Sequence, residues 1–180
     1  MIQCSPICYI IGAILLLLLP LNWLFSAIFA ALVHELCHIL AVCLMGGKIR
    51  KIQISPGGCV IECWHPEPAA KVFSILAGPL GSFSLLFFRR IYPQIAVCGL
   101  IQGIFNLLPV FPLDGGRILQ LLLEHFVPTK ADCLLKAIRN VIILVLLGWM
   151  FWLKTDLFTV IFVLVCLLRP LPRKFPCKVT

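Results

Sequence analysis

The pentapeptide His34-Glu35-Leu36-Cys37-His38 lies near the middle of an apolar run from Trp23 to Met45. Residues four apart share one face of an α-helix, so His34 and His38 can direct both imidazoles at one metal ion. Glu35 lies about 100° around the helix from His34, near enough to act on a water molecule beside that ion. Polar side chains in hydrocarbon cost about 2.5 to 3.5 kcal/mol each on insertion scales, so three ionisable groups on one apolar helix indicate a functional site.

The composition is that of an integral membrane protein. The chain has 180 residues, of which 62% are hydrophobic and 12% charged, and its mean hydropathy is +1.10. This length predicts a single domain over residues 1–180. The net charge of +8 suits contact with anionic headgroups at a cytoplasmic surface. Because the basic residues are scattered through short loops, we expect no nucleic-acid partner.

Hydrophobic runs predict an all-α protein with about six transmembrane helices. The predicted spans are residues 7–19, 23–45, 69–88, 91–107, 134–153 and 157–168. The first run has no basic start and no cleavage site, so we interpret it as retained. It is short, and a single helix kinked at Pro20 is an alternative. Residues 48–63 predict a β-hairpin-like loop around Ser55-Pro56-Gly57-Gly58, with an available edge.

A second informative stretch runs from Asn106 to Arg117, after the fourth predicted helix. Its two prolines break the helix, and Gly115-Gly116 allows close backbone approach. Asp114 offers the carboxylate that would complete a three-ligand zinc site with one open position. Residues 118–126 are predicted to form an amphipathic helix at the membrane interface. Glu124 and His125 in it are interpreted as solvated rather than metal-ligating.

The ten cysteines do not predict a disulfide framework, since many lie within apolar runs and there behave as small hydrophobic residues. Cys59 and Cys63, followed by His65, could form a second metal or redox site. Their spacing matches no strong zinc signature, so reduced loop thiols are the alternative interpretation.

Charge asymmetry predicts the orientation. The loops after the second and fourth predicted helices, together with the tail, carry Lys48, Arg50, Lys51, Lys71, Arg117, Lys130, Lys136, Arg139, Arg169, Arg173, Lys174 and Lys178. The opposite side carries Arg89, Arg90 and Lys154. The positive-inside rule therefore predicts that the second, fourth and sixth helices end in the cytoplasm, as does the C-terminus. The active site is then expected to open to that side.

Taken together, the two stretches resemble the site-2 protease family of intramembrane zinc metalloproteases. The match consists of His34-Glu35-x-x-His38, then Asn106-x-x-Pro109 followed by Asp114-Gly115. The stretch Asn-Leu-Leu-Pro-x-x-Pro-Leu-Asp-Gly-Gly is similar to the subgroup of the stage-IV sporulation protease of endospore-forming bacteria. Gly78-Pro79 and the hairpin-like stretch also fit that family.

This resemblance implies zinc held by His34, His38 and Asp114, with Glu35 as the catalytic base. It implies that Asn106 helps to position the substrate, although Asn106 could instead cap its helix before Pro109. The implied substrate is a membrane-tethered protein, such as a sigma-factor precursor or anti-sigma factor, and the implied location is a bacterial cell membrane. Sporulation-type relatives often carry a C-terminal nucleotide-sensing domain, which we do not expect here.

Other functions use similar residues. A metal transporter would favour polar groups on several helices, whereas one cluster is visible here. A non-catalytic zinc scaffold would favour four protein ligands, whereas three are found. The oligomeric state is open, and a homo-oligomer is possible.

Overall fold

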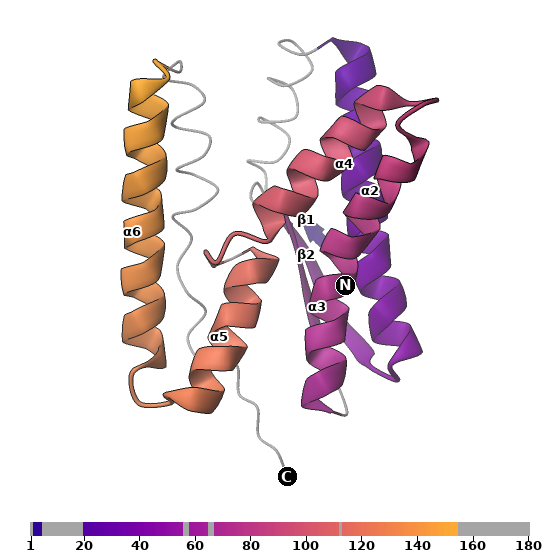
Figure 1. Cartoon of the computed structure of the whole chain (residues 1–180). Helices are drawn as coiled ribbons and strands as arrows, with labels where there is room; N and C mark the ends of the chain where they lie inside the picture. Colours follow the sequence, from indigo (N-terminus) through magenta and orange to yellow (C-terminus); the bar gives the residue numbers. More distant parts are fainter. Residues whose placement is uncertain (1, 5–19, 56–57, 65–66, 112, 155–180) are drawn as a thin grey trace.

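The computed structural model describes residues 2–4, 20–55, 58–64, 67–111 and 113–154 (Figure 1). These residues are mostly helical, as predicted, with a small sheet in addition. The elements are the strands β1 (Ile2–Cys4), β2 (Lys48–Ser55) and β3 (Gly58–Trp64), the helices α2 (Leu21–Leu44), α3 (Pro68–Ser84), α4 (Pro93–Asn106), α5 (Asp114–Phe126) and α6 (Ala131–Trp152), and the 3₁₀ helix η1 (Leu85–Phe88).

Helix α2 carries the pentapeptide and agrees closely with its predicted range. It begins directly after Pro20 and ends where Gly46 adopts a φ of +70°, a conformation that suits glycine. The amide of Gly47 donates to the carbonyl of Val42 at 2.8 Å, and that of Gly46 donates to Cys43 at 3.2 Å. These two bonds form a Schellman motif, so the helix stops before the basic loop that begins at Lys48.

Three of the described helical segments are long and apolar enough to cross a membrane: Leu21–Leu44, Pro68–Phe88 and Ala131–Trp152. Helix α4 has 14 residues, which is about 21 Å and less than the roughly 30 Å of a hydrocarbon core. The fourth predicted span is therefore shorter than expected. The predicted spans 7–19 and 157–168 lie outside the described residues.

The structure corrects the prediction around Asp114. We expected Asp114 in an irregular stretch after the fourth span, with an amphipathic helix from residue 118. Instead α5 begins at Asp114 itself, so α4 and α5 are two short helices separated by the break at residues 107–113. The break occurs because prolines cannot continue the α-helical hydrogen-bond ladder.

Several described amides of the break form hydrogen bonds within it or to the end of α4. The amide of Val110 donates to Leu108 at 2.7 Å, and that of Leu113 donates to Val110 at 2.9 Å. Val110 and Leu113 are buried and pack against Ile143 of α6. Irregular backbone is tolerated at membrane depth where protein covers it, and here α6 provides part of that cover.

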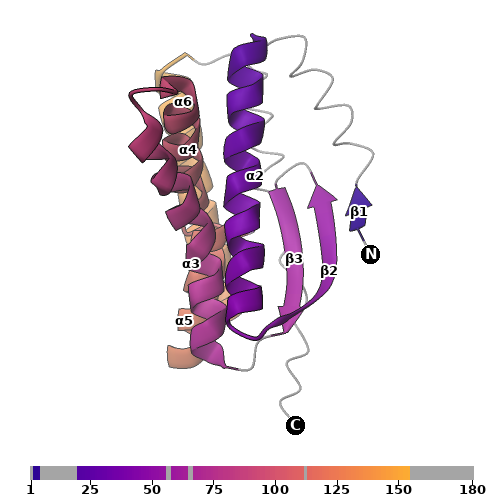
Figure 2. The ribbon, with the colours of Figure 1, turned by 90° about the vertical axis from the view of Figure 1, so that its right-hand side faces the viewer.

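The sheet has the order β1-β2-β3. Strands β2 and β3 pair antiparallel, with Lys48 opposite Trp64 and Ser55 opposite Gly58, so two antiparallel strands lie in the predicted hairpin stretch. Strand β1 pairs parallel to β2, with Ile2 opposite Ile52. It thus covers the outer edge of β2, while β3 lies on the side of α2 (Figure 2).

We expect the break to depend on Gly115. A Cβ atom on Gly115 would overlap the backbone carbonyl of Leu107, whereas one on Gly148, an exposed position of α6, would meet nothing within 4 Å. Gly115→Ala should lower the free energy of unfolding by about 1 to 3 kcal/mol because the backbone must separate. Gly148→Ala should be neutral or stabilise by up to about 1 kcal/mol. Unfolding by SDS titration in mixed micelles measures both, and equal stability of the two variants would contradict the expectation.

Candidate metal centre

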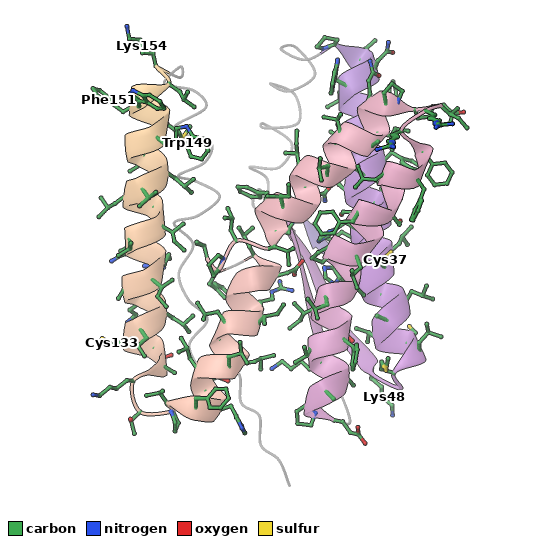
Figure 3. The ribbon with its side chains drawn as sticks, in the orientation of Figure 1. Cys37, Lys48, Cys133, Trp149, Phe151 and Lys154 are labelled. Atoms are coloured by element: carbon green, nitrogen blue, oxygen red, sulfur yellow. The ribbon has the colours of Figure 1, made fainter. Side chains whose placement is uncertain are left out.

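Helices α2 and α3 run antiparallel and are in contact along the pentapeptide His34–His38. In Figure 3 the label of Cys37 marks the position of this pentapeptide on α2. His34 contacts Ser82, and four residues further along α2, His38 lies against Gly78 of α3. A Cβ atom on Gly78 would overlap the His38 ring. The step of four residues on α2 is therefore matched by a step of four on α3, and the missing side chain of Gly78 makes room for the second imidazole.

The donor atoms of three side chains converge at one point. Nε2 of His34 and Nε2 of His38 each lie 3.1 Å from Oδ2 of Asp114 and 3.2 Å from one another. All three residues are buried. The predicted convergence of His34, His38 and Asp114, which are separated by up to 80 positions in sequence, is thus present in the structure.

The hydrogen bonds behind the imidazoles identify which atoms face the centre. Nδ1–H of His38 donates to the backbone carbonyl of Ser74 at 2.7 Å. A carbonyl only accepts, so the proton of the neutral ring is on Nδ1 and Nε2 presents a lone pair. That lone pair faces the Asp114 carboxylate, which is also an acceptor. Two acceptors at 3.1 Å repel unless a cation lies between them, so the cluster calls for a metal ion or an additional proton.

The spacing of the donors fits one face of a tetrahedron. Ligands bound to zinc at about 2.0 to 2.1 Å in a tetrahedral arrangement lie about 3.3 Å apart. The observed sides of the triangle are 3.1, 3.1 and 3.2 Å. Among the residues that the structure describes, no fourth His, Cys, Asp or Glu joins this group. The donor set therefore fits an ion with three protein ligands and an open position.

Asp114 reaches the imidazoles because α5 begins there. Its other oxygen, Oδ1, lies 3.7 Å from Nη1 of Arg117, one turn further along α5. Gly116 lies between them in sequence, two residues after Asp114, and a Cβ atom on Gly116 would overlap the backbone of Val110. The carboxylate is thus held between a guanidinium on one oxygen and the two imidazoles on the other, and this orients Oδ2 toward the centre.

Glu35 lies next to the ligands on α2 and is half-buried. Its Oε2 atom is buried and has no hydrogen-bond partner among the described residues. A buried carboxylate oxygen without a partner is costly, so it is expected to meet a molecule that the protein atoms do not supply. Water is the smallest such molecule.

The described hydrogen bonds of the other candidate residues do not involve His34, His38 or Asp114. The Asn106 side chain donates from Nδ2 to the carbonyl of Gln102 at 3.1 Å, at the end of α4. Glu124 accepts a hydrogen bond from Gln120 at an exposed position, and neither Glu124 nor His125 belongs to the metal group. The Cys59 side chain and His65 lie outside the described part of the chain, so the alternative site at Cys59, Cys63 and His65 stays a prediction.

Sequence reasoning missed the residues that support the ligands. Ser74, Gly78 and Ser82 are four apart and share one face of α3, yet from the sequence we singled out only Gly78, as part of the family resemblance. The signal was present, because this face repeats the four-residue spacing of His34 and His38 in an otherwise apolar helix. Arg117 was counted only as a basic loop residue.

Comparison with known proteins gives the family. The chain matches the family model described as Peptidase M50B-like over residues 7–110, and the model described as Peptidase family M50 over residues 85–148. It is 29% identical over 141 residues to the stage IV sporulation protein FB of Bacillus subtilis, covering 71% of this chain and 49% of that protein. It is 34% identical over 116 residues to a zinc metalloprotease of Methanocaldococcus jannaschii, covering 56% of this chain and 34% of that protein.

A solved structure shares the fold. The site-2 protease from Methanocaldococcus jannaschii aligns with a TM-score of 0.73 and 22% sequence identity, over 97% of this chain and 93% of that chain. The chain spans about half or less of the length of the two curated relatives. The resemblance predicted from the two motifs is confirmed, and because the M50B-like match covers more than half of its residues, this chain belongs to the M50 family of peptidases, which includes the site-2 proteases.

Proposed function

We propose that this chain is an intramembrane zinc metalloprotease that hydrolyses a peptide bond in or near the membrane segment of a membrane-tethered protein. The observation that carries the proposal is the triangle of acceptor atoms from His34, His38 and Asp114, with sides of 3.1 to 3.2 Å. The unpartnered carboxylate oxygen of Glu35 beside it supplies the second requirement, a base. The zinc metalloprotease among the relatives supports the choice of metal.

Each residue has a distinct role in this proposal. His34, His38 and Asp114 hold zinc, which supplies Lewis-acid chemistry for peptide hydrolysis. Glu35 accepts a proton from the attacking water and passes it to the departing amine. The overall reaction consumes one water and yields a carboxylate and an amine. Asn106, the last residue of α4 before the break that leads to Asp114, helps to position the substrate.

The substrate must present an extended backbone. A helical segment hides its carbonyls in its own hydrogen bonds, so it has to unwind locally before cleavage. Addition of the unwound strand to a sheet edge would satisfy its backbone groups again. Strand β1 already pairs with Ile52–Ile54 of β2, and β3 lies beside α2, which carries Glu35 (Figure 2). We therefore assign the docking edge to β3.

Water reaches this centre from the basic end of the molecule. His38 is six residues from Leu44, the last residue of α2, which is about 9 Å along the helix axis. Leu21, at the other end, is about 20 Å from His34. The end of α2 nearer to the centre is therefore the one beside Lys48, which lies opposite the Lys154 end of α6 (Figure 3), and we assign water entry to that side. By the positive-inside rule this is the cytoplasmic side of a bacterial cell membrane.

Candidate substrates follow from the relatives. One relative is a stage IV sporulation protein, so a membrane-tethered sigma-factor precursor or anti-sigma factor is the first class to test. Co-expression of such precursors with this chain, followed by detection of a clipped product, tests the proposed function directly. The wild-type chain should release the product, whereas absence of any clipped precursor from a metal-loaded, folded enzyme would contradict this substrate class.

Glu35→Gln should abolish cleavage while zinc stays bound. The amide keeps the size of the side chain but cannot accept the proton from water, so we expect a loss of at least about 100-fold in rate. Glu124→Gln makes the same change at an exposed position of α5 and is the matched control. The rate is measured on the co-expressed precursor, and metal content by elemental analysis of the purified protein. Cleavage by Glu35→Gln at the wild-type rate would refute the base role.

His34→Ala and Asp114→Ala should each reduce both zinc content and cleavage, because each removes one of three ligands. His125→Ala, which removes an imidazole outside the cluster, should leave both unchanged. The same variants separate the alternative functions. A zinc-retaining scaffold predicts bound metal in the wild type without hydrolysis of any tethered precursor, and a transporter predicts zinc flux into vesicles that Glu35→Gln leaves intact.

The orientation is tested with two cysteines at opposite ends of α6. Cys133 is exposed in the first turn of α6, and Lys154 lies just after its last turn. In a chain whose other cysteines are replaced, an impermeant maleimide should label Lys154→Cys in intact bacterial cells. It should label Cys133 only after the membrane is permeabilised. The reverse pattern would show that the basic end faces outward.

A further inference from the structure

We infer that Ser82 is a positioning residue for His34, fixing the tautomer and the ring orientation with which His34 meets the metal. This inference rests on the proposed function and deepens it. It follows from a single contact: Nδ1 of His34 lies 2.9 Å from Oγ of Ser82. The relative exposures are 2% for His34 and 0% for Ser82, so water does not compete for this hydrogen bond.

The direction of the bond follows from the opposite side of the ring. Nε2 of His34 faces Oδ2 of Asp114 and Nε2 of His38, so it is the metal-facing nitrogen and carries no proton when the metal is bound. The single proton of a neutral imidazole is then on Nδ1, and Nδ1–H donates to the Ser82 hydroxyl oxygen. A hydrogen-bond acceptor in this position makes the other nitrogen a better ligand and restrains ring rotation.

The two imidazoles are held by different means. His38 donates to the backbone carbonyl of Ser74, which no side-chain substitution removes. His34 depends on a hydroxyl group, so its support can be deleted by removing one oxygen atom. Ser82 is itself held in place, because Gly99 of α4 lies so close that a Cβ atom there would be 2.7 Å from the Ser82 carbonyl oxygen.

The test measures metal affinity and coordination rather than cleavage. Full-length protein in detergent is titrated with zinc against a chromophoric chelator, and the cobalt form is examined by absorption spectroscopy. Ser82→Ala should weaken zinc binding by about 10- to 100-fold and change the cobalt spectrum, since the His34 ring loses its acceptor. Ser82→Cys keeps the shape of the side chain with a somewhat larger atom, but its thiol is a poor acceptor, so it should change both in the same direction.

Ser26→Ala is the matched control. Ser26 is a buried serine on α2 whose hydroxyl donates to the carbonyl of Asn22 within its own helix at 2.8 Å. It should bind zinc like the wild type. If the wild type binds zinc while Ser82→Ala binds equally tightly with an unchanged cobalt spectrum, the inference about Ser82 is overturned and the proposed function stands. If the wild type itself binds no zinc, the proposed function fails and the inference fails with it.

Discussion

The structure depends on an arrangement that is unfavourable for protein atoms alone. Two imidazole nitrogens and one carboxylate oxygen face one another within 3.2 Å in a buried space. His38 cannot relieve this by placing its proton inward, because the Ser74 carbonyl requires that proton on the outer nitrogen. Acceptors brought together in this way need a metal ion or an additional proton, and in a medium of low dielectric the need is stronger than in water. The helices are therefore packed around a point that favours a positive charge.

Holding these acceptors together determines how the helices can pack. In the α2–α3 contact, Gly78 leaves room for the His38 ring, and Ser82 lies within hydrogen-bond distance of the His34 ring. The small residues of α3 therefore position the imidazoles as well as allowing close helix packing. Gly81 shows the same pattern, because a Cβ atom there would overlap the Cys37 sulfur. A bulkier face on α3 would separate the helices and place both rings out of reach of Asp114.

The three residues of the cluster could be identified from the sequence because the signals that mark them are local. His34 and His38 are related by helical periodicity, and Asp114 is set apart by the prolines and glycines around it. The supporting residues could not be found in this way. Ser82 and Gly78 acquire their roles only when α3 lies antiparallel to α2 at one particular register, and the sequence alone does not specify that register. The prolines predict the break but not that α5 begins at Asp114 rather than at residue 118, and in the structure Val110 and Leu113 just before Asp114 pack against Ile143 of α6.

The break between α4 and α5 places the Asp114 carboxylate beside the two imidazoles. A continuous helix through residues 107–113 would form its own backbone hydrogen bonds, but no new helix would then begin at Asp114. In the broken chain, Val110 and Leu113 pack against Ile143, and the amides of Val110 and Leu113 form hydrogen bonds within the break. Because α5 begins at the level of the imidazoles, the carboxylate reaches them from a different element, and no single helix has to supply all three donors.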